Sequence, residues 1–246
     1  MTSAIKNEQV AQEGVSNKRD WAYLIPAMAM PTFATLCYFV WFADSKLAWA
    51  LYGATKVLMF VFPALLYFAF ERRKLEWDAD ARRRAWSSIP LGLLTGGGVV
   101  ALALICWNWT PLGDYVRANA TKISEHLTGL QLLDPKVYIP LSLFIITVHS
   151  LFEEYYWRWF VFGRLSRQIP ANWAILIAGF AFAAHHYVVL DRFFTPFGTI
   201  FFGTCVGLGG MLWCWMLRRQ RTLIGCWISH ALVDAVVLGI GWLLLF

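Results

Sequence analysis

Residues Tyr138 to Phe162 read YIPLSLFIITVHSLFEEYYWRWFVF, an apolar stretch that carries several ionisable side chains. A transmembrane helix needs about 20 predominantly apolar residues, so this stretch is long enough to cross a bilayer. Six further stretches have the same character, and together they give the expected spans Trp21–Ala43, Leu47–Phe70, Ile89–Trp107, Tyr138–Phe162, Trp173–Leu190, Phe193–Leu217 and Thr222–Phe246. Because these stretches are too long for barrel strands, the sequence predicts an all-α polytopic membrane helix bundle of about seven transmembrane helices.

The overall composition agrees with a membrane protein. Of the 246 residues, 59% are hydrophobic and 15% are charged, whereas soluble domains average about 45–50% apolar and about 25% charged residues. Residues 1–20 are polar and lack the apolar core of a signal peptide. We therefore expect an N-terminal tail over 1–20 and a single transmembrane domain over 21–246. The five cysteines lie in apolar stretches without a CxxC pair and are expected to be buried thiols.

Lys and Arg residues are distributed unevenly between the predicted loops. Most of them fall on the side of the N-terminus, as in the runs at 72–74, 82–84 and 218–221. Cytoplasmic loops are the ones enriched in Lys and Arg, so we expect the N-terminus in the cytoplasm and the C-terminus outside. The net charge of +6 is then explained by this topology and by the interaction of the basic loops with anionic lipid headgroups. The sequence predicts an integral multi-pass protein of a bacterial cytoplasmic membrane, with the lipid bilayer as a partner and no nucleic acid.

Ionisable side chains within the predicted spans are candidates for function, because a charge at mid-bilayer costs at least about 2.5–3.5 kcal/mol. They are Lys56, His149, Glu153, Glu154, Arg158, His185, His186, His230 and Asp234.

The densest group is Glu153-Glu154-x-x-x-Arg158. Adjacent side chains on an α-helix point about 100° apart, so the two carboxylates cannot do the same work. Glu154 and Arg158 are four residues apart and can form an ion pair on one helix face. Glu153 is then left with His149, also four residues away, as its nearest partner. Glu153 is therefore the better candidate for a general base.

Two later spans bring histidine and carboxylate groups to a similar depth. His185 and His186 are adjacent and point apart, so one of them can enter a site while the other packs. His230 and Asp234 are four residues apart and share a helix face.

Such groups suit two kinds of hydrolytic site. Glu153, His186 and His230 could hold a divalent metal such as zinc. Alternatively, Glu and His side chains activate water without a metal while other groups stabilise an oxyanion. HExxH is absent from the sequence. The residues leave the choice of cofactor open.

Three motifs in this order resemble the CPBP family of intramembrane proteases, the CAAX-protease and bacteriocin-processing group that includes type II prenyl endopeptidases. They are Glu153-Glu154-x-x-x-Arg158, Phe182-x-x-x-His186 and His230-x-x-x-Asp234, within a protease-like core at about 138–238. The resemblance implies water activation by Glu153 and His186, and oxyanion stabilisation or metal binding by His230 and Asp234. Glu154 and Arg158 are implied to support the site, and the spacing from Phe182 selects His186, with His185 in reserve.

Asp234 departs from the common family pattern, in which the fourth position of the third motif is often Asn. An ionised Asp cannot donate a hydrogen bond to an oxyanion. Asp234 is therefore expected to be protonated, to orient His230 or to bind a metal.

The leading hypothesis is an intramembrane endopeptidase that cleaves a membrane-associated protein or peptide by glutamate- and histidine-activated water. One alternative is a non-catalytic membrane scaffold or chaperone that keeps the polar groups for helix packing. Another is an ion-coupled transporter, since intramembrane Glu, His and Asp also form relays. We find no inverted repeat of the kind that many transporters carry.

Overall fold

The computed structural model describes residues 18–43, 45–72, 78–129 and 132–246. These residues form helices and turns, without a strand among them. The helices long and apolar enough to cross a membrane are Asp20–Trp41, Lys46–Phe70, Ala79–Trp109, Pro135–Gln168, Ala171–Leu190, Pro196–Gln220 and Ile224–Leu245. The all-α class and the seven predicted spans are thus confirmed. Most of the predicted N-terminal tail, 1–20, lies outside the described residues.

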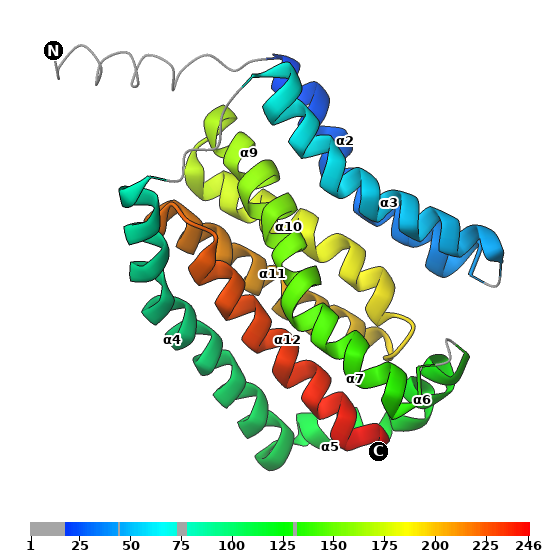
Figure 1. The fold of residues 1–246 in the computed structure, drawn as a ribbon. Helices are drawn as coiled ribbons and strands as arrows, with labels where there is room; N and C mark the ends of the chain where they lie inside the picture. The colour runs from blue at the N-terminus through cyan, green and yellow to red at the C-terminus, as the bar shows by residue number, and fades with distance from the viewer. Residues whose placement is uncertain (1–17, 44, 73–77, 130–131) are drawn as a thin grey trace, which may run out of the picture.

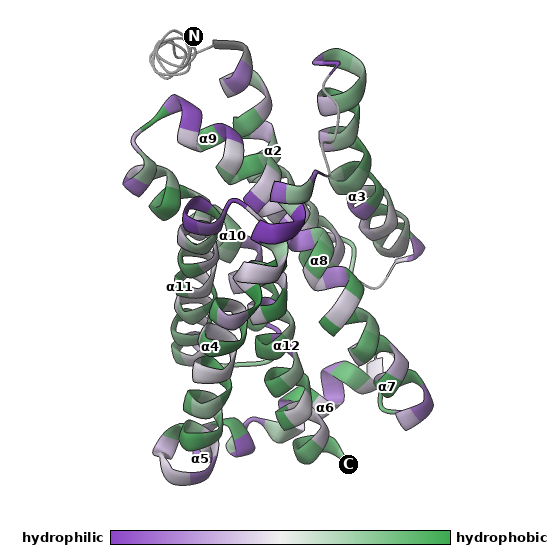
Figure 2. Ribbon diagram, turned by 60° about the vertical axis from the view of Figure 1, so that its left-hand side comes forward, coloured by the Kyte–Doolittle hydropathy of each residue, from purple (hydrophilic) through white to green (hydrophobic). Residues whose placement is uncertain are grey.

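The first described helix begins at one end of the bundle, and the last helix ends at the opposite end (Figure 1). We call the end at which the first helix begins the N-terminal end and the other the C-terminal end. The hydropathy colouring in Figure 2 shows apolar residues along the helices and polar residues concentrated toward their ends and connections.

The first two spans form a hairpin at the edge of the bundle (Figure 1). Each is an α-helix that ends in a short π-helical segment: α2 (Lys18–Leu36) with η2 (Cys37–Trp41), and α3 (Lys46–Leu65) with η3 (Leu66–Phe70). Helix α2 packs mainly on α10, whereas α3 contacts its own hairpin and the fourth span. Helix α3 therefore leaves many apolar side chains uncovered, among them Val57 and Phe60.

The third span starts earlier than the hydropathy pattern suggests. Helix α4 runs over Ala79–Trp109, ten residues ahead of the predicted start at Ile89. The Asp78 side chain accepts a hydrogen bond from the Ala81 N–H at 2.7 Å and so caps the first turn. The Arg-rich segment before the apolar stretch is thus helical, because a cap and good helix formers outweigh its polarity.

The connection expected at 108–137 contains two short helices, α5 (Pro111–Ala118) and α6 (Ala120–Gly129). They lie at the C-terminal end of the bundle (Figure 1). The Tyr115 hydroxyl lies 2.6 Å from the Thr195 hydroxyl, and Lys122 Nζ donates to the Phe194 carbonyl at 2.6 Å. These contacts fasten the two helices to the connection between α10 and α11.

The fourth span is one continuous helix with two π-helical interruptions. Its segments are α7 (Pro135–Phe144), η4 (Ile145–His149), α8 (Ser150–Glu153), η5 (Glu154–Phe162) and α9 (Gly163–Gln168). Glu153 and Glu154 thus fall at the boundary between α8 and η5. π-Helical turns are rare in proteins, and those that occur are often found at functional sites.

The last three spans are α10 (Ala171–Leu190), α11 (Pro196–Gln220) and α12 (Ile224–Leu245). Helices α10 and α11 pack against each other, and α4 packs along α12. Glycines allow the close approach of α4 and α12: a Cβ atom on Gly92 would lie 2.5 Å from the Gly225 carbonyl oxygen, and one on Gly96 would lie 2.9 Å from the Ser229 Cα. Small residues at such contacts are typical of membrane helix pairs.

The buried core is centred on η5. Tyr156, Trp157 and Phe160 are almost completely buried, together with Phe182 from α10 and Trp213 from α11. The ionisable side chains of the three motifs lie against this aromatic core, which holds them away from the lipid.

Candidate functional site

Glu153 lies at the centre of a group of imidazoles. Its side chain is buried, with Oε1 at 3.2 Å from His149 Nε2 and 3.8 Å from His185 Nε2. Its other oxygen, Oε2, lies 3.7 Å from His230 Nε2. The pairing with His149 expected from the sequence is present. Histidines from α10 and α12 also surround this carboxylate: His230 was expected at the site with Glu153, whereas His185 was held in reserve.

Glu154 joins Arg158 and His230. Its Oε2 atom lies 3.3 Å from Arg158 Nε, and both side chains are fully buried. Its Oε1 atom lies 2.8 Å from His230 Nδ1. The expected ion pair is therefore found, and Glu154 has a second contact that the sequence did not reveal. The two neighbouring glutamates reach opposite nitrogens of the same imidazole.

Arg158 is held by one carboxylate and two aromatic rings. Its guanidinium carbon lies 4.3 Å from the centre of the Phe182 ring and 4.7 Å from that of Trp213. Cation–π contacts of this kind stabilise a desolvated cation. Nη1 and Nη2 have no hydrogen-bond partner among the described residues.

The His230 ring is fixed from several sides. A hydrogen bond from Nδ1–H to Glu154 leaves Nε2 facing Glu153 Oε2 and Asp234 Oδ1, each at 3.7 Å. The ring also stacks on Trp213, with centroids 4.0 Å apart and planes at 17°. Orienting His230 was one of the roles expected for Asp234, and the shorter contact to this ring comes from Glu154.

The stack of Trp213 on His230 is supported by residues that the sequence did not single out. Trp213 Nε1 donates to Ser229 Oγ at 3.1 Å, and Thr95 Oγ1 of α4 donates to the same oxygen at 3.1 Å. Ser229 is fully buried and precedes His230 in α12. No motif marks these residues, and only the closeness of α4 and α12 reveals them.

Both histidines of α10 face the site. His186 Nδ1 lies 3.0 Å from the Phe182 carbonyl oxygen, so an Nδ1–H group donates there and Nε2 keeps its lone pair. The rings of His185 and His186 are 4.0 Å apart, and His185 stacks on Trp157 with planes at 3°. The expectation that one of the two would serve only packing is therefore not met in the structure.

These side chains also form a possible metal site. One ligand atom each from Glu153, His185 and His186 can be chosen so that all lie within 4.8 Å of one another. Glutamate and histidine are ligands that suit zinc. The set predicted from the sequence had His230 in place of His185. His230 Nδ1 donates to Glu154, so Nε2 is the nitrogen through which His230 could bind a metal.

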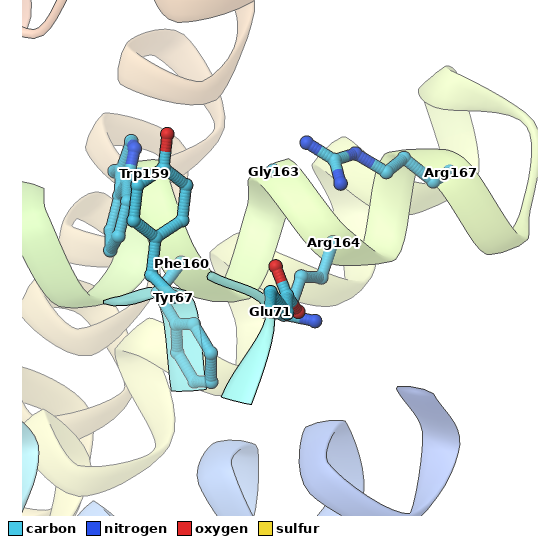
Figure 3. Close-up of a pocket in the computed structure, with 7 residues that line it drawn as sticks. All are labelled: Tyr67, Glu71, Trp159, Phe160, Gly163, Arg164 and Arg167. Carbon is cyan, nitrogen blue, oxygen red and sulfur yellow. The ribbon is translucent and has the colours of Figure 1, made fainter. Parts of the chain in front are cut away.

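A separate pocket lies nearer the N-terminal end, on the same span. Tyr67, Glu71, Trp159, Phe160, Gly163, Arg164 and Arg167 line it (Figure 3). Arg164 forms ion pairs with Glu71 and, at 3.2 Å, with Asp20. Arg164 is eleven residues beyond Glu153, which is about 16 Å along a helix. These ion pairs tie the first hairpin to α9 and lie away from the motif residues.

The six site residues predicted from the sequence thus come together from three spans. They are Glu153, Glu154, Arg158, His186, His230 and Asp234, with His149 and His185 as additional neighbours.

Comparison of the chain with curated proteins and with solved structures finds no match in either. Residues 135–236 match a family model described as type II CAAX prenyl endopeptidase Rce1-like. The matched segment contains all three motifs and begins with the fourth span. It does not include the first three spans. The match confirms the resemblance drawn from the motifs: the segment that carries the site is similar to the Rce1-like family of type II CAAX prenyl endopeptidases.

Proposed function

We propose that this protein is an intramembrane endopeptidase that hydrolyses a peptide bond in a membrane-associated protein or peptide. The observation that carries the proposal is the convergence of Glu153, His186 and His230 from three spans on one buried point. A carboxylate and imidazoles at such a point are the groups that activate water and stabilise an oxyanion. The similarity of the matched segment to a membrane protease family supports the same reaction.

Glu153 is the general base in this proposal. A water molecule between Glu153 and His186 Nε2 would give a proton to the carboxylate while its oxygen attacks the peptide carbonyl carbon. His186 can accept a hydrogen bond through Nε2 because its Nδ1–H is committed to Phe182. The proton on Glu153 would then pass to the leaving amine. The low exposure of Glu153 keeps bulk water from competing in these steps.

His230 is the oxyanion donor. With Nδ1–H bonded to Glu154, a hydrogen on Nε2 is the one available to the tetrahedral intermediate. Asp234, 3.7 Å from the same nitrogen, supports a ring that carries both hydrogens. A preorganised oxyanion donor contributes about 10²–10³ in kcat. Glu154 and Arg158 are positioning residues, since they act on the site through His230.

A divalent metal would fit the cluster of Glu153, His185 and His186. Such an ion would supply a Lewis acid and a more acidic bound water. The metal content of the purified protein, compared between wild type and His185→Ala, measures whether these residues hold one.

The test is a comparison of new peptide N-termini in membranes from cells that express wild type or Glu153→Gln at equal levels. Glu125→Gln, an exposed glutamate of α6, is the matched control. We expect a set of termini present with wild type and Glu125→Gln and absent with Glu153→Gln, since a missing general base lowers the rate about 10²–10⁴-fold. Identical profiles for all three proteins would refute the proteolytic function and favour a non-catalytic scaffold.

A further inference from the structure

Lys56 of α3 is a half-buried cation that the proposed reaction does not use. It lies ten residues from the start of its span at Lys46 and fourteen from the end at Phe70. These distances correspond to about 15 Å and about 21 Å along a helix. A lysine side chain is too short to reach either membrane surface from there, so Lys56 cannot place its charge among the headgroups.

The contacts of α3 place Lys56 beside the candidate site. The Tyr155 hydroxyl donates to the Phe60 carbonyl at 3.1 Å, and the rings of Phe60 and Phe152 are 5.3 Å apart. These contacts set Phe60 level with Glu153. Lys56 precedes Phe60 by one helical turn, so it lies about 6 Å nearer the C-terminal end of the bundle.

Electrostatics support this placement. The Lys56 ammonium interacts electrostatically with the Glu153 carboxylate and with the His185 imidazole. Tyr38 and Tyr52, which pack edge to face at 5.3 Å, interact with Glu153 in the same way. This face of the first hairpin therefore forms a wall of the site.

Lys56 has no close counter-ion in the described part of the chain. No carboxylate lies within 4.0 Å of Nζ, and the neighbour in contact with the ammonium is the Tyr52 ring, at 5.4 Å from its centroid. Glu153 and Glu154, the two glutamates of the site, already have imidazole or guanidinium partners. A half-buried ammonium in a membrane is costly unless an anion pairs with it.

We propose that Lys56 binds a carboxylate of the peptide substrate next to the scissile bond and so determines specificity. This inference rests on the proposed function. The offset of about 6 Å from Glu153 corresponds to roughly two residues of an extended peptide. The carboxylate therefore belongs to the C-terminus of the substrate or to an Asp or Glu side chain about two residues from the cut. Lys56 lies outside the segment that matches the protease family, so this specificity is a property of the first hairpin.

The experiment compares membranes from cells that express wild type, Lys56→Gln, Lys56→Arg or Glu153→Gln at equal levels. Lys46→Gln, an exposed lysine at the start of the same helix, is the matched control. Termini that depend on Glu153 define the cleavage sites. We expect these sites to carry a nearby carboxylate and to be cut about 10- to 100-fold less by Lys56→Gln, the loss typical of one charge-assisted hydrogen bond. Lys56→Arg and Lys46→Gln should retain cleavage.

Peptides copied from those sites then identify the source of the carboxylate. In one series the C-terminal carboxylate is replaced by an amide, and in the other the acidic side chain is replaced by Asn or Gln. Removal of the carboxylate that Lys56 binds should raise the KM of wild type for the peptide and have little effect on the KM of Lys56→Gln. An equal drop in kcat for charged and neutral peptides with Lys56→Gln would overturn the inference, since it would mean that Lys56 acts only on Glu153. Sites without a nearby carboxylate would also overturn it. If no terminus depends on Glu153, the proposed function itself fails.

Discussion

Replacement of Arg158 by Met should expose the energetic cost of the buried cluster. Arg158→Met keeps most of the side-chain volume and removes the charge that faces Glu154 at 3.3 Å, together with the cation–π contacts to Phe182 and Trp213. Loss of one partner of a buried ion pair costs about 3–5 kcal/mol, because the other charge stays buried without compensation. Glu154 keeps its hydrogen bond from His230, so we expect a loss of about 3 kcal/mol, at the lower end of that range.

A second substitution separates the charge from the packing. Glu154→Gln in the Arg158→Met background removes the uncompensated charge and keeps an oxygen that can accept from His230 Nδ1. The double variant should therefore be more stable than Arg158→Met by about 1–3 kcal/mol. Such a recovery is a coupling between contacting residues, which independent sites do not show.

The assay is equilibrium unfolding in mixed micelles, with the detergent composition varied and the helical circular dichroism followed. Arg83→Met, on the exposed face of α4, is the control and should stay within about 0.5 kcal/mol of wild type. The reasoning is refuted if Arg158→Met unfolds within about 1 kcal/mol of wild type, or if the double variant loses the sum of the two single losses.

Three further predictions concern the surroundings of the site. Gly92→Ala should destabilise the protein by about 1–3 kcal/mol, because its Cβ would meet the Gly225 carbonyl, and this loss should appear as a lower thermal midpoint in detergent. An unchanged midpoint would contradict the close packing of α4 on α12. Burial, followed by the two basic neighbours Arg192 and Lys122, lowers the pKa of His126 in α6, so the unfolded chain binds more protons than the folded one. Helix α6 should therefore lose hydrogen-exchange protection as the pH falls below the usual histidine pKa of 6.5. His126→Gln should abolish this pH dependence. Trp213→Phe removes the hydrogen bond to Ser229 and should lower kcat about fivefold with KM unchanged, as expected for about 1 kcal/mol of lost positioning; a change in KM alone would indicate a role in binding.

The membrane topology could be predicted from the sequence because hydropathy alone specifies a spanning helix. The seven predicted spans agree with the structure within a few residues, except at the start of α4 and at the end of the fourth span, which reaches Gln168 rather than Phe162. That start was missed because a capped, arginine-rich helical segment has no hydropathy signal. Helices α5 and α6 were missed for the same reason: they are short, and their polar residues resemble those of a loop.

The site could be predicted in composition but not in contacts. The spacing of four residues correctly placed Glu154 with Arg158 and Glu153 with His149. Contacts between spans depend on helix rotation and depth, which one sequence does not specify. The sequence placed these groups at a similar depth, and the structure brings Glu153, His186 and His230 together. The bond between Glu154 and His230, and the second histidine at the site, became visible only once α10 and α12 were packed on η5.

The π-helical segments of the fourth span limit how its length can change. A π-helical turn accommodates an additional residue, because its hydrogen bonds join residues five apart. Deletion of a single residue from η5 would allow that turn to revert to α-helical bonding and would leave the residues after it close to their present orientation. The same deletion in an α-helical segment such as α8 would rotate everything after it by about 100°. Arg164 would then face away from Asp20 and Glu71, and the first hairpin would lose its attachment to α9. This span should therefore keep its attachment to the first hairpin after a one-residue deletion within η5 and lose it after a one-residue deletion within α8.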